Sequence, residues 1–142
     1  MNVLAPYLLF NGNCHEAMNF YKSCFGGELQ LMMNADAPDN ACPGGMKLDP
    51  KQVMHACLSK DGFSLMASDN PMATPKAGDN ISLCVNCKTT EETDTLFKNL
   101  SAGGTVTMPL ANTFWGAYFG TVTDKYGFHW MLNCHLDNSS AA

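Results

Sequence analysis

Strand-like and helix-like hydrophobic patterns follow one another in the same order twice along the chain. Each half opens with an apolar run of β-strand length, continues with apolar residues three or four apart as in an amphipathic helix, and ends with three more strand-like runs. In the first half the predicted strands are residues 6–12, 29–35, 53–59 and 63–68. In the second half they are residues 80–86, 105–110, 115–123 and 128–134.

One predicted helix lies between the first and second strands of each half, at residues 13–28 and 89–104. Asn13 stands where a side chain would cap the first helix, and both helical patterns run into a pair of glycines, Gly26-Gly27 and Gly103-Gly104. An Asn at the start and Gly at the end are typical helix boundaries. The order predicted for each half is therefore β-α-β-β-β.

Two heptapeptides support a duplication. KDGFSLM at residues 60–66 and KYGFHWM at residues 125–131 share Lys, Gly, Phe and Met at the same places, with an offset of 65. The glycine pairs that end the two helices are 77 residues apart, and the long connection at residues 34–50 accounts for the difference. Matching features in the same order indicate two copies of one module.

The predicted fold class is α+β, with two paired β-α-β-β-β modules whose curved mixed sheets enclose a cavity. A sheet with one helix buries only one of its faces, so the other faces of two paired modules are left to line the cavity. At 142 residues the chain is expected to form a single domain. Module 1 covers about residues 5–70 and module 2 about residues 79–136, and residues 137–142 form a tail.

The composition argues against a nucleic-acid-binding protein and against a membrane protein. A net charge of −5 argues against nucleic acid as a partner, because nucleic-acid-binding proteins normally present a basic face. No apolar run approaches the roughly 18 residues of a membrane span, and the N-terminus has no signal-peptide pattern, so we expect a cytoplasmic protein. The seven cysteines are odd in number and irregularly spaced, which favours reduced thiols over a disulfide framework.

Several segments carry a family resemblance. PYLLFNGNCHEAMNFYKSCFGGEL, VMHACL, LMASD and FWGAYFGTVTDKYGFHWMLN together span most of residues 5–135. They resemble the PhnB-like, glyoxalase/bleomycin-resistance branch of the vicinal oxygen chelate superfamily. The resemblance implies curved sheets around a pocket for a small organic ligand, and commonly a homodimer. Some members carry a demethylubiquinone methyltransferase label, but this sequence has no Gly-rich strand-to-helix loop for a nucleotide-like methyl donor.

The superfamily usually places a divalent metal between His and Glu ligands from the first and last strands of each module. By resemblance, those positions fall on Ala5, Met66, Asn80 and Met131. A thioether is a poor ligand for hard or borderline divalent metals, so a catalytic metal is disfavoured and no cofactor is expected. A histidine pair with carboxylates from the 34–50 loop, namely Asp36 and Asp39, is left as an alternative metal site.

Alternation along the strands assigns side chains to sheet faces. If Met66 and Met131 face the cavity, so do Ser64 and His129, while their sequence neighbours face the helices. The 65-residue offset also aligns Tyr118 with Val53. A mixture of polar groups and flexible Met suits a small-ligand pocket. The cavity-facing candidates are Tyr7, His55, Ser64, Met66, Asn80, Ser82, Trp115, Tyr118, His129 and Met131.

Two functions are compatible with this pattern. The first is a small-molecule-binding protein of the glyoxalase/bleomycin-resistance type without the usual metal. The alternative is a lyase, isomerase or transferase-like enzyme of the same fold, with His55 or His129 as a base or with a non-standard metal site. Each candidate also has a simpler role, the histidines as hydrogen-bonded core-edge residues and the aromatics and methionines as packing or interface residues.

Overall fold

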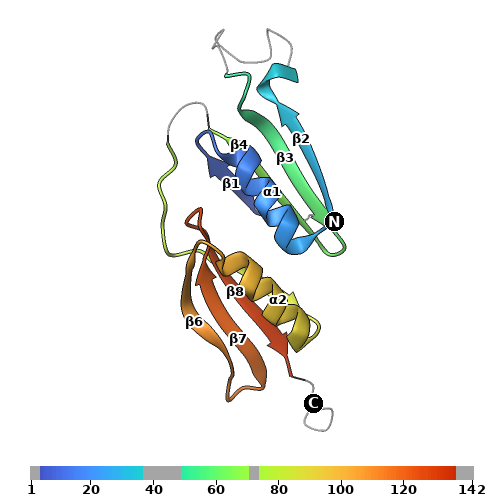
Figure 1. The fold of residues 1–142 in the computed structure, drawn as a ribbon, viewed down its shortest axis with the longest axis vertical. Helices are drawn as coiled ribbons and strands as arrows, with labels where there is room; N and C mark the ends of the chain where they lie inside the picture. The colour runs from blue at the N-terminus through green and yellow to red at the C-terminus, as the bar shows by residue number, and fades with distance from the viewer. Residues whose placement is uncertain (1–3, 37–48, 71–73, 137–142) are drawn as a thin grey trace. The chain divides into compact units, whose positions relative to one another are not determined.

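The computed structural model describes residues 4–36, 49–70 and 74–136 (Figure 1). The chain divides into two compact units, residues 1–76 and 77–142. Unit 1 contains β1 (Tyr7–Phe10), α1 (Cys14–Phe25), β2 (Glu28–Met33), the short 3-10 helix η1 (Asn34–Asp36), β3 (Val53–Lys60) and β4 (Phe63–Asp69). Its four strands form one sheet, here called sheet A, in the order β1-β4-β3-β2. The β1–β4 pair is parallel and the other pairs are antiparallel.

Unit 2 repeats this arrangement. It contains β5 (Leu83–Cys87), α2 (Thr90–Ser101), β6 (Thr105–Asn112), β7 (Ala117–Thr123) and β8 (His129–His135). The strands form sheet B in the order β5-β8-β7-β6, with β5 and β8 parallel. The α+β class, the two β-α-β-β-β modules and their mixed sheets are thus confirmed. Enclosure of a cavity by paired modules and their grouping into one domain stay predictions, and the tail 137–142 lies outside the described residues.

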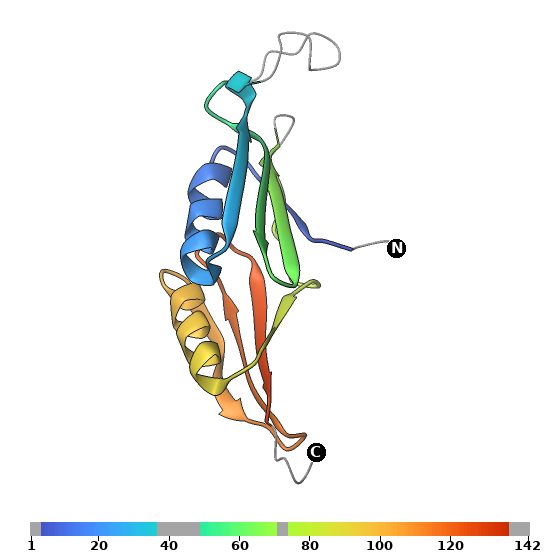
Figure 2. The ribbon, with the colours of Figure 1, turned by 90° about the vertical axis from the view of Figure 1, so that its right-hand side faces the viewer.

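Each helix covers one face of its own sheet, as Figure 2 shows. In unit 1, α1 packs against β2, β3 and β4, and it buries Ala17, Met18 and Tyr21. The sheet residues on that side are also buried, and they are Leu8, Ala56, Leu58, Leu65 and Ala67. Removing these apolar side chains from water is the main favourable contribution to folding of the unit. In unit 2 the buried set includes Leu96, Leu100, Val122, Trp130 and Leu132.

The start of α1 is held by a strand rather than by its own cap residue. Asn13 occupies the N-cap position but makes no side-chain cap hydrogen bond. Instead the buried carboxylate of Asp69, at the end of β4, accepts hydrogen bonds from the backbone N–H groups of Gly12 at 2.7 Å and Cys14 at 3.1 Å. Its other oxygen accepts from the N–H of Val53 at 2.8 Å. One buried side chain therefore joins β4, β3 and α1.

The two hairpins differ by one residue, which changes the alignment of the modules. Ser59 pairs with Ser64 across four intervening residues, 60–63, whereas the equivalent pair Thr123 and His129 spans five, 124–128. The offset of 65 thus holds for β4 and β8, but it is 64 for β3 and β7. The extra residue fits because the buried Asp124 carboxylate organises this longer turn. It accepts from the backbone N–H groups of Tyr126 and Phe128 and from the Trp130 indole N–H.

Among the residues that the structure describes, no helix is both long enough and apolar enough to cross a membrane.

Candidate functional site

The face of sheet A opposite α1, here called the far face, carries four of the predicted site residues. Tyr7 pairs with Met66, and Ser64 lies two residues before Met66 on β4. Cys57 pairs with Met66 from β3, and His55 lies two residues before Cys57. Strand residues two apart and residues directly opposite one another share a face. Tyr7, His55, Ser64 and Met66 therefore lie together, and their role in binding a ligand stays a prediction.

Tyr7 and His55 are in direct contact across the far face. The Tyr7 hydroxyl lies 3.2 Å from His55 Nδ1, and the ring centroids are 5.8 Å apart with an interplanar angle of 38°. Tyr7 is 45% exposed. The hydrogen bond fixes the orientation of the imidazole. Among the described residues, Nε2 of His55 has no hydrogen-bond partner, so it is the ring atom available to another molecule.

His129 and Met131 share a face of sheet B, but the imidazole of His129 is fully engaged. Its Nε2 lies 2.9 Å from the carbonyl oxygen of Gly78, which only accepts, so Nε2 donates. In the neutral ring Nδ1 then accepts from the hydroxyl of Thr123 at 2.9 Å. His129 is therefore placed to hold the chain that precedes β5, and it presents no free nitrogen for proton transfer.

Tyr118 is a helix-side residue, contrary to the prediction. It pairs with the buried Cys134, and its hydroxyl donates to Asp94 Oδ1 of α2 at 2.5 Å. This hydrogen bond to a carboxylate raises the pKa of Tyr118, with smaller contributions from desolvation and from the charge of Asp94. The error comes from the longer β7–β8 turn. With an offset of 64, Tyr118 corresponds to Met54 and the counterpart of His55 is Phe119.

The sequence predicts Asn80 and Ser82 on a cavity-facing strand, and this is wrong because β5 begins at Leu83. Both residues lie in the irregular segment before it, so strand alternation does not assign them a face. Their sequence, with Gly78 and Asp79 just upstream, is typical of a turn and explains the late start.

Trp115 lies in the short β6–β7 connection and is 58% exposed. Its ring contacts Phe114, at a centroid distance of 5.1 Å, and Phe119, at 6.2 Å. Phe119 pairs with Asn133 on β8, two residues after Met131, and so shares the face of Met131. Sequence reasoning missed Phe119. An alignment of β7 with β3 that allows for the extra residue in the second hairpin pairs Phe119 with His55 and would have identified it.

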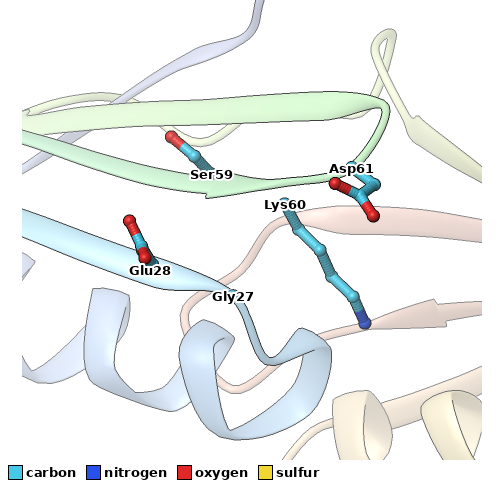
Figure 3. A pocket seen from close by; sticks show the side chains of 5 residues that line it. All are labelled: Gly27, Glu28, Ser59, Lys60 and Asp61. Carbon is cyan, nitrogen blue, oxygen red and sulfur yellow. The ribbon is translucent and has the colours of Figure 1, made fainter.

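A separate pocket of about 450 Å³ lies near the end of α1, and none of the predicted residues lines it. Its walls come from Gly27 and Glu28 at the start of β2 and from Ser59, Lys60 and Asp61 at the β3–β4 hairpin (Figure 3). The Lys60 ammonium donates to the carbonyl oxygen of Phe25 at 2.7 Å, so it satisfies the C-terminus of α1. The pocket is explained by this packing of a hairpin against a helix end.

Known proteins resemble the chain over nearly its whole length. The family described as 3-demethylubiquinone-9 3-methyltransferase matches residues 2–133. The chain belongs to this family. It is 36% identical to protein YjdN of Escherichia coli K12, over 92% of this chain and 93% of that protein. The predicted PhnB-like resemblance is therefore confirmed at the level of the family.

Solved structures agree with this family assignment. Protein PA1353 from Pseudomonas aeruginosa is 41% identical, with a TM-score of 0.81 over 96% of this chain and 100% of that one. A PhnB protein from Bacillus cereus, named as a putative 3-demethylubiquinone-9 3-methyltransferase, is 32% identical, with a TM-score of 0.73 and coverage of 94% and 99%. A glyoxalase/bleomycin resistance protein/dioxygenase family enzyme from Burkholderia phytofirmans, at 15% identity and a TM-score of 0.62 over 92% and 95%, shows the shared fold.

The residues at the expected ligand positions of this PhnB-like chain do not fit the divalent metal of the wider superfamily. Met66 pairs with Tyr7 and Met131 with Cys84, so the expected carboxylate positions carry thioethers beside a phenol and a thiol. Within the described ranges, no three His, Cys, Asp or Glu residues group as metal ligands. Asp36 accepts from the N–H of Met33, and Asp39 lies outside the described residues. A hard divalent ion finds no adequate ligand set here.

Proposed function

We propose that this protein binds a small organic molecule, as its resemblance to the glyoxalase/bleomycin-resistance type implies. We further propose that it does so without the divalent metal that is usual in the superfamily. The observation that carries the proposal is the Tyr7–His55 contact on the far face of sheet A, where Met66 is the strand partner of Tyr7. A hydroxyl and an imidazole held in a fixed relation beside a flexible thioether form the kind of surface that orients a small ligand. A purely structural sheet face has no need of this combination.

The chemistry of the far face favours a ligand with an aromatic or apolar body and at least one hydrogen-bonding group. Tyr7 offers an exposed ring edge and a hydroxyl, and His55 offers Nε2. Met66 adapts to irregular apolar shapes because its side chain has three rotatable bonds. Ser64 adds a hydroxyl two residues along β4. A fully charged or strongly anionic ligand would find no cationic side chain among these residues.

Catalysis by His55 is the second candidate function. It is favoured by one observation, the free Nε2 of an imidazole whose Nδ1 is held by Tyr7. A general base needs this arrangement of an oriented ring with one nitrogen open to substrate. His129 is not part of this proposal, because both of its nitrogens are hydrogen-bonded.

Methyl transfer, which the family description names, does not enter the proposal. The nucleotide-like donors of methyltransferases that use a doubly wound fold bind at the carboxyl ends of parallel strands, beside a Gly-rich turn. Both sheets here are mixed, and the β1–α1 connection has a single glycine, Gly12. We also propose that the protein is a homodimer and is located in the cytoplasm, as expected from the sequence.

Ligand-induced thermal stabilisation tests the binding function. A panel of small aromatic and polar compounds is screened against the wild-type protein, and each hit is repeated with Tyr7→Phe and His55→Ala. Hits that use the far face lose stabilisation in both variants. Tyr118→Phe is the matched control, because it removes a hydroxyl on the helix side of sheet B. Equal stabilisation of all variants would contradict the proposed site.

Two further measurements separate binding from catalysis. Metal analysis of protein purified without a histidine tag tests the absence of a divalent ion, and stoichiometric zinc, nickel, manganese or iron would overturn that part of the proposal. Turnover of a stabilising compound, with a pH–rate profile that His55→Ala abolishes, would establish the catalytic candidate instead. Stabilisation without turnover supports the binding function.

A further inference from the structure

The repeated methionine of each module has a cysteine as a direct cross-strand neighbour. Met66 on β4 pairs with Cys57 on β3, and Met131 on β8 pairs with Cys84 on β5. Residues directly opposite one another in an antiparallel pair, as Met66 and Cys57 are, have Cβ atoms about 4.5–5.5 Å apart and share a face. A thioether and a thiol at this separation are close enough for their sulfur atoms to bind one ion.

Two more donors, an imidazole and a second thioether, adjoin the pair on sheet A. His55 lies two residues before Cys57 on β3, and Met32 on β2 pairs with His55. The four side chains therefore follow a zigzag across three adjacent strands, from Met32 to His55 to Cys57 to Met66. The thiol of Cys57 lies 3.5 Å from the hydroxyl of Ser59, two residues along the strand, which places it on the same face.

His55 already has the orientation of a metal ligand. A ligating imidazole normally bonds through one nitrogen and donates its other N–H to a nearby acceptor, which fixes the ring. Here the Tyr7 hydroxyl lies at hydrogen-bond distance from Nδ1, and Nε2 has no partner among the described residues. Tyr7 thus takes the supporting role and leaves Nε2 available to ligate an ion.

We propose that the far face of sheet A binds a soft monovalent cation, Cu(I) or Ag(I). The ligands are the Cys57 thiolate, the Met66 thioether and His55 Nε2, with the Met32 thioether as a fourth donor. Thiolate and thioether ligands select soft ions, and imidazole suits copper. Binding displaces the proton of the Cys57 thiol to solvent, with no change of oxidation state. The proposal goes beyond the small-molecule function and does not depend on it.

Sheet B has fewer suitable ligands for a soft ion than sheet A. It keeps the Cys84–Met131 pair, but the position equivalent to His55 holds Phe119, which cannot ligate. Met131 pairs on its other side with Thr121, a poor ligand for a soft ion. The site on sheet A therefore has three or four suitable donors including an imidazole, whereas sheet B has the Cys84–Met131 pair and, beyond Thr121, the Met108 thioether. The first equivalent of ion is expected on sheet A.

Silver(I) titration of protein labelled with methyl-13C methionine tests the placement directly. The first equivalent of Ag(I) is expected to shift the methyl signals of Met32 and Met66 and to leave Met108 and Met131 unchanged. Cys57→Ser is expected to abolish this first step. A first equivalent that shifts Met131 and is lost in Cys84→Ser would overturn the proposal.

Competition with a chromophoric Cu(I) chelator under anaerobic, reducing conditions measures the affinities. Met66→Leu and His55→Ala are each expected to weaken Cu(I) binding by at least tenfold, and Tyr7→Phe by about tenfold, the lower end of supporting-shell effects. Met108→Leu, an exposed methionine of sheet B, is the matched control. Circular dichroism of each variant checks folding. Affinities within twofold of wild type for both Met66→Leu and His55→Ala would contradict the site, whatever the small-molecule screen finds.

Discussion

The hydroxyl of Tyr118 donates to Oδ1 of Asp94 at 2.5 Å and so joins the middle of sheet B to α2. The hydrogen bond to the carboxylate holds the proton on the phenol oxygen, and desolvation and the negative charge of Asp94 further disfavour a phenolate. The pKa of Tyr118 is raised for these reasons, although the residue lies near the surface. The contact makes Tyr118 a reporter of how α2 sits on its sheet.

Asp94→Asn is expected to lower the pKa of Tyr118, because the substitution replaces the carboxylate acceptor of the hydrogen bond with a weaker amide acceptor and removes the negative charge. An ultraviolet absorbance titration of the tyrosines measures it, with Tyr118→Phe identifying the component that belongs to this residue. Glu91→Gln, also in the first turns of α2, provides the control for charge alone. An unchanged Tyr118 component in Asp94→Asn would show that the contact does not form in solution.

Gly120→Ala is expected to destabilise the protein by about 1–3 kcal/mol, the usual range for overpacking a filled core. A Cβ at this position would lie 2.8 Å from Phe97 Cε2 and 3.0 Å from Leu110 Cδ2. The close packing of α2 against β7 therefore requires that residue 120 has no side chain. Chemical denaturation measures the change.

The control for that variant is Gly78→Ala, where the nearest atom would be Asn80 Oδ1 at 3.8 Å. Equal free energies of unfolding for the two alanine variants would contradict the close packing of Phe97 and Leu110 around Gly120.

The sequence predicted the modules because periodicity is a local property that each segment carries by itself. The alternation that placed Met66 and His129 away from the helices needed only the register within one strand. The face assigned to Tyr118 was wrong, because that assignment used the alignment of the two modules and so depended on the length of the β7–β8 turn. The extra residue in this turn, which Asp124 organises, does not show in the match of the two heptapeptides.

Contacts between segments that are distant in the chain also could not be predicted from the sequence. The Tyr7–His55 pair joins residues 48 apart on β1 and β3, which are separated by β4. The helix cap was predicted from Asn13, the local candidate, whereas the acceptor is Asp69, brought to Gly12 and Cys14 by the parallel pairing of β1 with β4. Local propensity identifies a helix start, but tertiary structure decides which side chain satisfies it.

Asp69→Asn is expected to destabilise the protein by about 1–3 kcal/mol. The carboxylate accepts three backbone N–H groups, and an amide must turn its own NH₂ toward at least one of them. The free energy of unfolding measured by chemical denaturation gives the effect. Asp61→Asn, at the exposed β3–β4 turn, is the matched control and should change stability little. A decrease in the free energy of unfolding in Asp61→Asn but not in Asp69→Asn would contradict the role assigned to Asp69.

Cys14 should make the protein progressively less stable in alkaline solution. Burial, with the nearby Asp69 charge, raises the pKa of its thiol from 9.0 to about 12. Between these values the unfolded chain has lost the Cys14 proton while the folded chain keeps it. A raised folded-state pKa gives stability that is fully present below pH 9 and is lost as the pH rises toward 12.

The decline of the free energy of unfolding from pH 9 to pH 11 is therefore expected to be smaller in Cys14→Ala than in the wild type, even though the smaller side chain lowers stability at neutral pH. Iodoacetamide labelling followed by peptide mass mapping gives an independent measure. Because the thiolate is the nucleophile, Cys14 should stay unmodified in the folded protein at pH 8 and react once denaturant is added. Rapid labelling of Cys14 in the folded state, or identical alkaline slopes for the two proteins, would contradict a buried, protonated thiol at the start of α1.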